Sequence, residues 1–251
     1  MKALVTGASS GMGRDMAIYL SELGYDLVLV SRDKDKLESV KKLIKTESEI
    51  IICDLSNIEE VKKLYVLNKN NDIDVLINCA GFGDFGYFTE TDVNKELNMI
   101  NTNVIAVHLL TKLFLKEMVK KDSGYIMNVA SSAAFGPGPL MSTYYATKAY
   151  VNNLTEGINE ELRRKKSNVF ICSLCPGPVD TNFNNVANVK FSLDGLNSKD
   201  VSKYAIDKMF KKKVVIVPGF LMKLALFGRR FASRRLIRKI SFNIQSKKDS
   251  R

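Results

Sequence analysis

The chain of 251 residues is poor in the residue types from which metal centres and hydrolytic triads are built. It contains no tryptophan, four cysteines and a single histidine, His108, which lies in an apolar stretch with helical spacing. A zinc site needs several Cys, His or carboxylate ligands, and a Ser–His–Asp triad needs a histidine beside its nucleophile. The sequence therefore predicts no metal site and no such triad.

Two of the four cysteines, Cys172 and Cys175, have the C-x-x-C spacing of redox and zinc motifs. They lie in the apolar run 169–175, which reads as a strand, and residues three apart in a strand point to opposite faces. We favour the interpretation that both are buried strand residues, with a redox or zinc pair as the alternative.

Long hydrophobic runs are also missing. The longest one near the end, residues 214–227, is interrupted by Pro218, Gly219 and Lys223 and is too short to cross a bilayer. The chain opens on the strand-like run Ala3-Leu4-Val5 instead of the pattern of a signal peptide. We therefore expect a cytoplasmic protein.

The formal net charge of +11 is concentrated in one segment. Residues 211–251 contain 13 Lys or Arg and one acid, Asp249, whereas the rest of the chain carries 25 basic and 26 acidic side chains. No nucleic-acid-binding module or set of base-stacking aromatic residues accompanies this charge, so we predict no nucleic-acid partner. The excess charge belongs to the tail and says nothing about the remaining body.

Short apolar runs alternate with amphipathic ones along the chain. Strands are predicted at residues 2–6, 26–31, 50–54, 74–78, 124–129, 169–175 and 214–217. Helices are predicted at residues 11–23, 33–45, 57–67, 93–121, 142–166 and 199–210. Strands rich in Val, Ile and Leu that alternate with helices predict an α/β fold, a doubly wound parallel sheet (Rossmann fold) of about seven strands with helices on both faces.

The first predicted strand runs into a glycine-rich turn, Thr6-Gly7-Ala8-Ser9-Ser10-Gly11-Met12-Gly13, that opens the first helix. Glycines let the backbone approach a pyrophosphate, and the N-terminus of the helix favours its charge. The second strand ends in Ser31-Arg32 instead of an acid, and Arg accommodates a 2′-phosphate. The sequence therefore favours NADP(H) over NAD(H), with Arg32 as a solvated loop residue being the alternative.

Tyr144 and Lys148 lie four residues apart on a predicted helix, on one face and one turn apart. A nearby cation favours the phenolate, so we expect Lys148 to lower the pKa of Tyr144. Such a tyrosine can act as an acid or base toward a hydroxyl or carbonyl group. By itself this spacing is common, and a surface pair is the alternative.

Together these motifs resemble the short-chain dehydrogenase/reductase family, in one order and over nearly the whole length. Besides the glycine-rich turn, the family's motifs are matched by Cys53-Asp54-Leu55, by Asn78-Cys79-Ala80-Gly81 with Cys79 in place of a second Asn, and by Pro176-Gly177-Pro178-Val179-Asp180-Thr181. The resemblance implies that the cofactor is bound by Gly7, Ser9, Ser10, Gly11, Met12, Gly13, Arg32, Asp54, Leu55, Asn78, Ala80, Gly81, Tyr144, Lys148, Pro176, Gly177, Val179 and Thr181.

The resemblance also implies a catalytic set of Asn103, Ser131, Tyr144 and Lys148, with Ser132 as the second choice for the serine. Tyr144 exchanges a proton with the substrate oxygen, Ser131 holds that oxygen, and Lys148 binds the nicotinamide ribose. Asn103 holds a water that relays protons to Lys148. The expected function is hydride transfer between NADP(H) and a carbonyl or hydroxyl group, and the alternative is a non-catalytic NADPH-binding regulator or a lipid-surface protein on the same fold.

Apolar residues indicate a hydrophobic ketone, aldehyde or ketoacyl substrate, with simple core packing as the alternative. They are Phe135, Leu140, Met141, Phe183, Val186, Val189, Phe191 and Leu193. We assign residues 1–218 to the catalytic domain, with a substrate lid at about 182–198, and residues 219–251 to a helical extension of the same domain. The overall pattern resembles a bacterial ketoacyl-reductase-like subgroup with a basic C-terminal helix.

The extension reads as two amphipathic pieces, with the break around residues 233–235, and basic residues flank both. Such a segment suits an anionic membrane surface, or it docks over a subunit interface or the mouth of the active site. Members of the family commonly pair through the helices expected at 93–121 and 142–166, so the resemblance implies a homodimer or homotetramer. The substrate itself, the direction and stereochemistry of the reaction and the role of the tail stay open.

Overall fold

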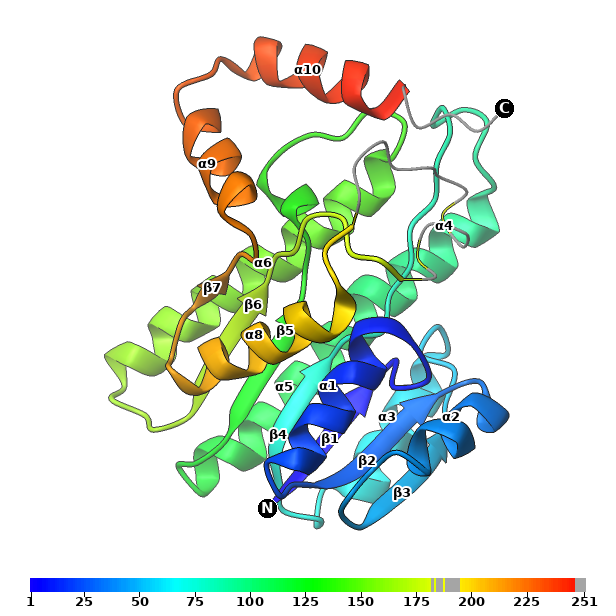
Figure 1. Ribbon diagram of the computed structural model, residues 1–251, viewed down its shortest axis with the longest axis vertical. Coiled ribbons are helices and arrows are strands. Elements are labelled where there is room, and N and C mark those ends of the chain that lie inside the picture. The colour runs from blue at the N-terminus through cyan, green and yellow to red at the C-terminus, as the bar shows by residue number, and fades with distance from the viewer. Residues whose placement is uncertain (182, 184–186, 188–194, 247–251) are drawn as a thin grey trace.

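The computed structural model describes residues 1–181, 183, 187 and 195–246 (Figure 1). Its centre is one sheet of seven parallel strands in the order β3-β2-β1-β4-β5-β6-β7. The strands are β1 Lys2–Thr6, β2 Asp26–Ser31, β3 Ser48–Ile52, β4 Ile73–Asn78, β5 Tyr125–Val129, β6 Phe170–Leu174 and β7 Val215–Ile216. The order reverses between β1 and β4, so the predicted doubly wound sheet is confirmed.

Helices cover both faces of the sheet (Figure 1). They are α1 Gly11–Glu22, α2 Lys34–Lys41, α3 Ile58–Asn68, α4 Val93–Ile100, the π-helix η1 Asn101–Ala106, α5 Val107–Lys120, the 3₁₀-helix η2 Ser132–Phe135, α6 Ser142–Arg164, α8 Ser198–Phe210, α9 Phe220–Arg229 and α10 Arg234–Ser246. One apolar core joins the sheet to α1, α2 and α8, and another joins it to α3, α5 and α6.

The alternation of side chains along the strands builds these two cores. In β1, Ala3 and Val5 belong to the core under α1 and α8, whereas Leu4 between them belongs to the core under α3 and α5. All three side chains are fully buried. A strand that is apolar on both sides is what a sheet covered on both faces requires.

Most elements differ from the predicted bounds by only one or two residues at an end, but the third strand is shifted as a whole and the second helix is shorter. The third strand, expected at 50–54, begins and ends two residues earlier because its register pairs Leu27 with Ser48 and Ser31 with Ile52. It is the edge strand, so the polar Glu49 is tolerated in it. The second helix, expected to reach residue 45, ends at Lys41, where the backbone tightens into turns that bond Leu43 to Val40.

The largest difference lies in the segment expected to be one helix from 93 to 121. It is three consecutive helical pieces, with the π-helix η1 between α4 and α5. A π-helix inserts an extra residue per turn, and such insertions occur frequently at functional sites. Here the π-helix contains Asn103, one of the predicted catalytic residues.

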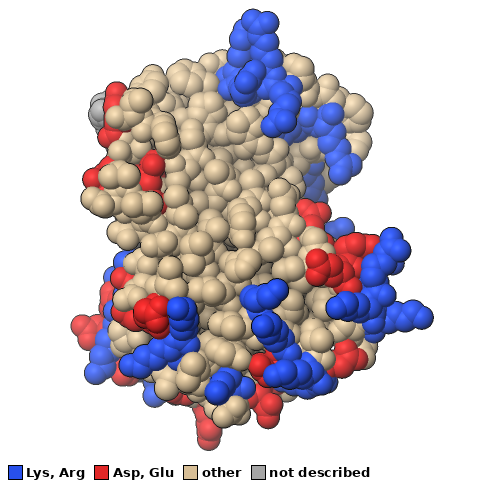
Figure 2. Space-filling model, turned by 180° about the vertical axis from the view of Figure 1, so that it is seen from behind, with Lys and Arg blue, Asp and Glu red and all other residues tan. Residues whose placement is uncertain are grey.

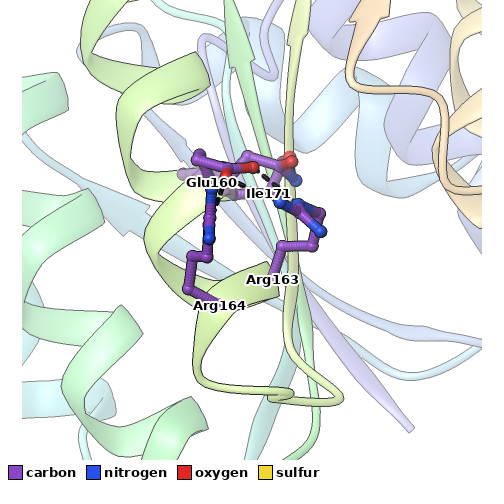
Figure 3. Close-up of polar contacts among 5 residues, drawn as sticks. Glu160, Arg163, Arg164 and Ile171 are labelled. Carbon is purple, nitrogen blue, oxygen red and sulfur yellow. Dashed lines mark hydrogen bonds and ion pairs between the residues drawn. The ribbon is translucent and has the colours of Figure 1, made fainter.

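The long helix α6 is anchored at the end far from its N-terminus, as Figure 3 shows. Glu160 accepts hydrogen bonds from Arg163 and Arg164, which hold its pKa down to about 2. One residue earlier, the amide of Asn159 donates to the backbone carbonyl of Ile171 in β6 at 2.9 Å. The Asn159 bond attaches this end of the helix to the sheet, whereas the Glu160 contacts lie within α6. Tyr144 and Lys148 lie in the first two turns of the same helix.

Beyond β7 the chain leaves the sheet and forms α9 and α10, which lie over the N-terminal end of α6 (Figure 1). The expected break in the tail around residues 233–235 is confirmed, since α9 ends at Arg229 and α10 begins at Arg234. Within the part of the chain that the structure describes, no helix has the length and apolar character needed to cross a bilayer.

Candidate active site

The glycine-rich turn after β1 is held close to the loop after β4. Gly7 has a φ of +69° and Gly11 a φ of +52°, conformations that glycine adopts most easily. A Cβ on Gly7 would come within 2.9 Å of the backbone of Ala80, and one on Gly13 would overlap the carbonyl oxygen of Gly7. The turn therefore packs so closely that a side chain at Gly7 or Gly13 would collide with backbone atoms.

Thr6 at the end of β1 joins these two loops, a role that sequence reasoning did not assign to it. Its hydroxyl oxygen accepts hydrogen bonds from the backbone N–H groups of Cys79 at 3.1 Å and Ala80 at 3.2 Å. The side chain is 1% exposed. The position directly before the first glycine was the only signal available in the sequence.

A cavity of about 580 Å³ runs along this edge of the sheet. Its lining includes most of the residues predicted to bind the cofactor, namely Gly7, Ser9, Ser10, Gly11, Met12, Gly13, Arg32, Asp54, Leu55, Ala80, Gly81 and Thr181. It also includes Ser31, whose hydroxyl donates to the Ser9 hydroxyl at 2.8 Å. A cradle in which added Cβ atoms would collide with backbone fits a dinucleotide pyrophosphate at the N-terminus of α1.

Arg32 and Asp54, both predicted to bind the cofactor, differ in whether their side chains already have partners. Arg32 is exposed on the cavity wall, and no acidic side chain among the described residues forms an ion pair with it. Asp54 is engaged locally, because its carboxylate accepts from both the backbone and the hydroxyl of Ser56. Arg32 is therefore the side chain whose charge is available to a ligand phosphate.

Asn78, also predicted to bind the cofactor, lines neither of the two cavities of this site. It is 1% exposed, and its amide donates to Asn128 at 2.8 Å and to Thr111 at 3.2 Å. Asn128 in turn donates to Thr155 on α6. This buried network ties β4, β5, α5 and α6 together behind the site.

A second cavity, of about 150 Å³, adjoins the first and shares Met12, Cys79, Gly81, Thr181 and Phe183 with it. Its lining contains three of the predicted catalytic residues and the predicted turn after β6, namely Ser131, Tyr144, Lys148, Pro176, Gly177 and Val179. Ser132, the second choice for the serine, lines it as well. The two predicted sites are thus adjacent, with walls that have residues in common.

Tyr144 is buried and lies within hydrogen-bonding contact of Ser131. Burial raises the pKa of Tyr144 above its ordinary value, and the hydrogen bond with Ser131 opposes that change only in part. The expected lowering of this pKa by Lys148 does not occur, because removal of the phenol from water outweighs any neighbouring charge. Tyr144 is therefore a protonated phenol at neutral pH.

Lys148 is also buried, with 5% of its surface exposed. Its Nζ donates to the carbonyl oxygen of Val129 at 2.8 Å and lies 5.8 Å from the centre of the Tyr144 ring. Burial lowers the pKa of Lys148 to about 8. A buried ammonium with one carbonyl partner retains donors that can serve a ligand in the cavity.

Asn103 is fully buried and does not line either cavity. Its Oδ1 accepts a hydrogen bond from the backbone N–H of Phe82 at 3.1 Å. Its Nδ2 donates to the backbone carbonyl of Phe82 at 2.8 Å and to the hydroxyl of Thr147. A Cβ on Gly81 would lie 3.0 Å from Oδ1 of Asn103 and 3.3 Å from Nζ of Lys148. The structure therefore brings Asn103 beside Lys148, with Gly81 between them.

The cysteines are all unpaired thiols. Cys172 and Cys175 in and after β6 belong to the cores on opposite faces of the sheet, as the strand interpretation predicted. Cys79 lines both cavities, and burial raises its pKa to about 12. Among the described residues, no group of three or more His, Cys, Asp or Glu side chains could hold a metal ion.

The wall opposite the sheet is apolar where the structure describes it. The ring of Phe183 lies 5.3 Å from that of Tyr144, centre to centre, and both pack with Met141. Met222 of α9 approaches Gly177, where a Cβ would lie 2.6 Å from its Cε. Most of the expected lid, including Val186, Val189, Phe191 and Leu193, lies outside the described residues.

Comparisons with known proteins agree with this geometry. The profile of the family described as short chain dehydrogenase matches residues 1–190. An uncharacterized oxidoreductase of Staphylococcus epidermidis is 34% identical over 182 residues, 71% of this chain and 78% of the relative. A short-chain dehydrogenase from Sphingobium yanoikuyae in complex with NADPH superposes with a TM-score of 0.82 at 28% identity, over 91% of this chain and 93% of that one. A short chain dehydrogenase/reductase from Burkholderia phymatum in complex with NAD superposes with a TM-score of 0.84 at 25% identity, over 94% of both chains.

Proposed function

The chain belongs to the short-chain dehydrogenase family and is an oxidoreductase of CH–OH groups that uses a nicotinamide cofactor. From this premise we propose that it uses NADP(H) and interconverts a hydrophobic ketone, aldehyde or ketoacyl compound with its alcohol. One observation carries the proposal. Ser131, Tyr144 and Lys148 line a small cavity that shares lining residues with the larger cavity along the glycine-rich turn.

The bound cofactor supplies the hydride, and the residues of the chain manage the charge on the substrate oxygen. Ser131 and Tyr144 are in contact and can both donate hydrogen bonds to one oxygen atom. Because burial keeps Tyr144 protonated, its phenol is ready to give a proton to a carbonyl oxygen that is being reduced. A protonated phenol is the form that the reductive direction requires.

Lys148 lies near the ring of Tyr144, and Asn103 lies next to Lys148. The Nζ of Lys148 has donors beyond the one used by Val129 and can bind the ribose of the cofactor. The Oδ1 and Nδ2 atoms of Asn103 are hydrogen-bonded to Phe82 and Thr147. Asn103 thus fixes the turn around Gly81 next to Lys148. We propose that the proton relay uses a water held beside Asn103 and Lys148.

Two features support NADP(H). The exposed Arg32 carries an unopposed positive charge at the cavity edge, and Ser31 beside it is small and uncharged. An acid at that position would repel a 2′-phosphate, whereas a guanidinium forms charge-assisted hydrogen bonds with it. The hydrophobic substrate class rests on the apolar contacts among Met141, Tyr144 and Phe183 around the reacting oxygen.

The same fold can serve as a non-catalytic NADPH-binding regulator, and one substitution separates the two functions. We expect Tyr144→Phe to abolish NADPH consumption with carbonyl compounds while NADPH affinity stays within about twofold, because the phenol oxygen lies in the substrate cavity. Ketone-dependent oxidation of NADPH followed by absorbance, together with calorimetric NADPH binding, tests this. The neighbouring Tyr150→Phe is the matched control on the exposed face of α6. Turnover by Tyr144→Phe at the wild-type rate would disprove the assignment.

We also propose that the chain forms a homodimer or homotetramer. Seen from behind, the molecule has a broad face largely without charged side chains (Figure 2). Exposed apolar side chains on α4 and α6 include Val93, Leu97 and Tyr150. Exposed apolar side chains on two neighbouring helices are typical of an interaction surface. Light scattering of Leu97→Glu against the wild type measures the oligomeric state.

A peripheral membrane contact of an otherwise cytoplasmic protein is proposed for the tail. The helices α9 and α10 and the turn between them expose large apolar side chains, namely Phe220, Leu221, Leu224, Phe227, Phe231, Leu236, Ile240, Phe242 and Ile244. Basic side chains project from this end of the molecule (Figure 2), and neither helix contains an acid. This combination suits anionic lipid. Co-sedimentation with anionic vesicles, compared with zwitterionic ones, tests it.

A further inference from the structure

The end of α9 lies against the loop that closes the catalytic cavity. The guanidinium of Arg229 contacts the backbone at Gly136, directly after η2, so that a Cβ on this glycine would collide with it. A residue with a side chain at this position would have to displace the guanidinium. Ser132 and Ala133 of the same loop line the catalytic cavity. The cation therefore packs against the loop that contributes these two residues to the cavity lining.

Among the described residues, this guanidinium has no partner of opposite charge. Nε and Nη2 of Arg229 are buried and have no hydrogen-bond partner among the described residues. None of the ion pairs between described residues includes Arg229, and α9 and α10 contain no acid. Buried charged groups in proteins are normally paired, because their removal from water is costly.

Two further polar groups lie next to it. Gln245 of α10 is 1% exposed, and its amide nitrogen donates to the hydroxyl of Tyr145, while its Oε1 is buried without a partner. Tyr145 lines the catalytic cavity, and its ring lies 6.2 Å from the ring of Tyr144, centre to centre. Arg229 is close enough to Tyr145 to lower the pKa of its phenol, against the larger effect of burial.

From these contacts we propose that Arg229 binds an anionic group at the far end of the substrate, with Tyr145 and Gln245 beside it. The substrate is then an amphipathic molecule, apolar around the reacting carbonyl and negatively charged at its other end. A carboxylate or a phosphate ester matches the planar fork of a guanidinium and accepts its unpaired donors. The substrate class rests on the proposed function, whereas the anion site does not.

Arg229 does not line the catalytic cavity itself, but it lies close to Tyr145, which does. Ser131 and Tyr144 mark the position of the carbonyl, Met141 and Phe183 provide apolar contacts around it, and Arg229 lies beyond Tyr145 on the tail. An entirely apolar ligand would leave the guanidinium unpaired. The tail is therefore a specificity element that tells charged from uncharged carbonyl compounds.

Binding to the full-length, NADPH-loaded protein tests the anion site without any need for turnover. Octanoate and its neutral analogue octanamide are titrated by calorimetry against the wild type, R229M and R229Q. The matched control is R230M, which alters the exposed residue directly after α9. We expect the wild type and R230M to bind octanoate about 10- to 100-fold more tightly than octanamide. In R229M and R229Q this preference should be lost.

Equal affinity of the wild type for the two compounds, or an undiminished preference in R229M and R229Q, would overturn the proposal. Octyl phosphate in a third titration distinguishes a phosphate ester from a carboxylate, by tighter binding than octanoate. A purely structural role of Arg229 would change the affinities for octanoate and octanamide alike.

Turnover supplies the second readout. For 7-oxooctanoate and its methyl ester, the ratio of the two kcat/KM values should fall by tenfold or more in R229M and stay unchanged in R230M. Failure of the proposed function appears differently, since no NADPH would then be consumed with either compound while octanoate would still bind through Arg229.

Discussion

The charge of Lys148 gives a prediction whose magnitude follows from its burial. Its pKa drops from 10.5 to about 8 because the ammonium is removed from water. At pH 7 the lysine is protonated in both the folded and the unfolded chain, so the folded state carries the full penalty. Between pH 8 and 10.5 the folded protein binds fewer protons than the unfolded one. Its stability therefore rises with pH across this window.

The size of the effect can be worked out from these two pKa values. Each pH unit inside the window adds about 1.4 kcal/mol to the free energy of unfolding. Between pH 7 and pH 9.5 the wild type should therefore gain about 2 kcal/mol relative to Lys148→Met, which has no titrating group at this position. Other residues titrate in the same range, but they do so in both proteins and cancel in the difference.

Urea unfolding of the cofactor-free wild type and of Lys148→Met at a series of pH values measures this difference. Lys112→Met on the exposed surface of α5 serves as the control. Its difference in unfolding free energy from the wild type should be the same at pH 7 and pH 9.5. If the difference in unfolding free energy between wild type and Lys148→Met is the same at pH 7 and pH 9.5, the lysine is not a buried, strained cation. The reasoning about its charge would then be wrong.

Three other substitutions test the cofactor cradle and its surroundings. Arg32→Ala should weaken NADPH binding about 10- to 100-fold and leave NADH nearly unaffected, as measured by calorimetry, and equal losses would exclude the phosphate role. Gly13→Ala should lower the free energy of unfolding by more than about 2 kcal/mol, because its Cβ would overlap the carbonyl of Gly7, and denaturant unfolding would show it. Gly157→Ala, in open space on α6, should instead raise that free energy by about 1 kcal/mol, so destabilisation there would contradict the packing.

The sequence was sufficient where local chemistry decides the outcome. Gly7 and Gly11 were placed in the turn by their order after a strand, and both have the positive φ that such a turn requires. Asp33 was expected at a helix start, and its side chain caps α2 by accepting from the backbone of Lys36 at 3.0 Å. The parallel sheet followed from Val-, Ile- and Leu-rich strands that alternate with amphipathic helices.

The spacing of four residues between Tyr144 and Lys148 also predicted that the two side chains share a face of α6. It did not give the direction of the pKa change of Tyr144, because that direction depends on burial by Phe183, Met141 and the loop after β5. Burial is a property of the surroundings, to which many distant segments contribute. The sequence around a tyrosine contains only its nearest neighbours along the helix.

Other features of the site needed the folded chain for the same reason. The π-helix around Asn103 exists where its amide meets the backbone of Phe82, which lies 21 residues away along the chain. The contact of Arg229 with Gly136 joins segments that no local motif connects. Residue type, order and spacing along the chain thus determined the family and the doubly wound parallel sheet, and they singled out the groups proposed to react. Only the tertiary structure decided their protonation and their partners, because desolvation and hydrogen bonding depend on groups that meet through folding alone.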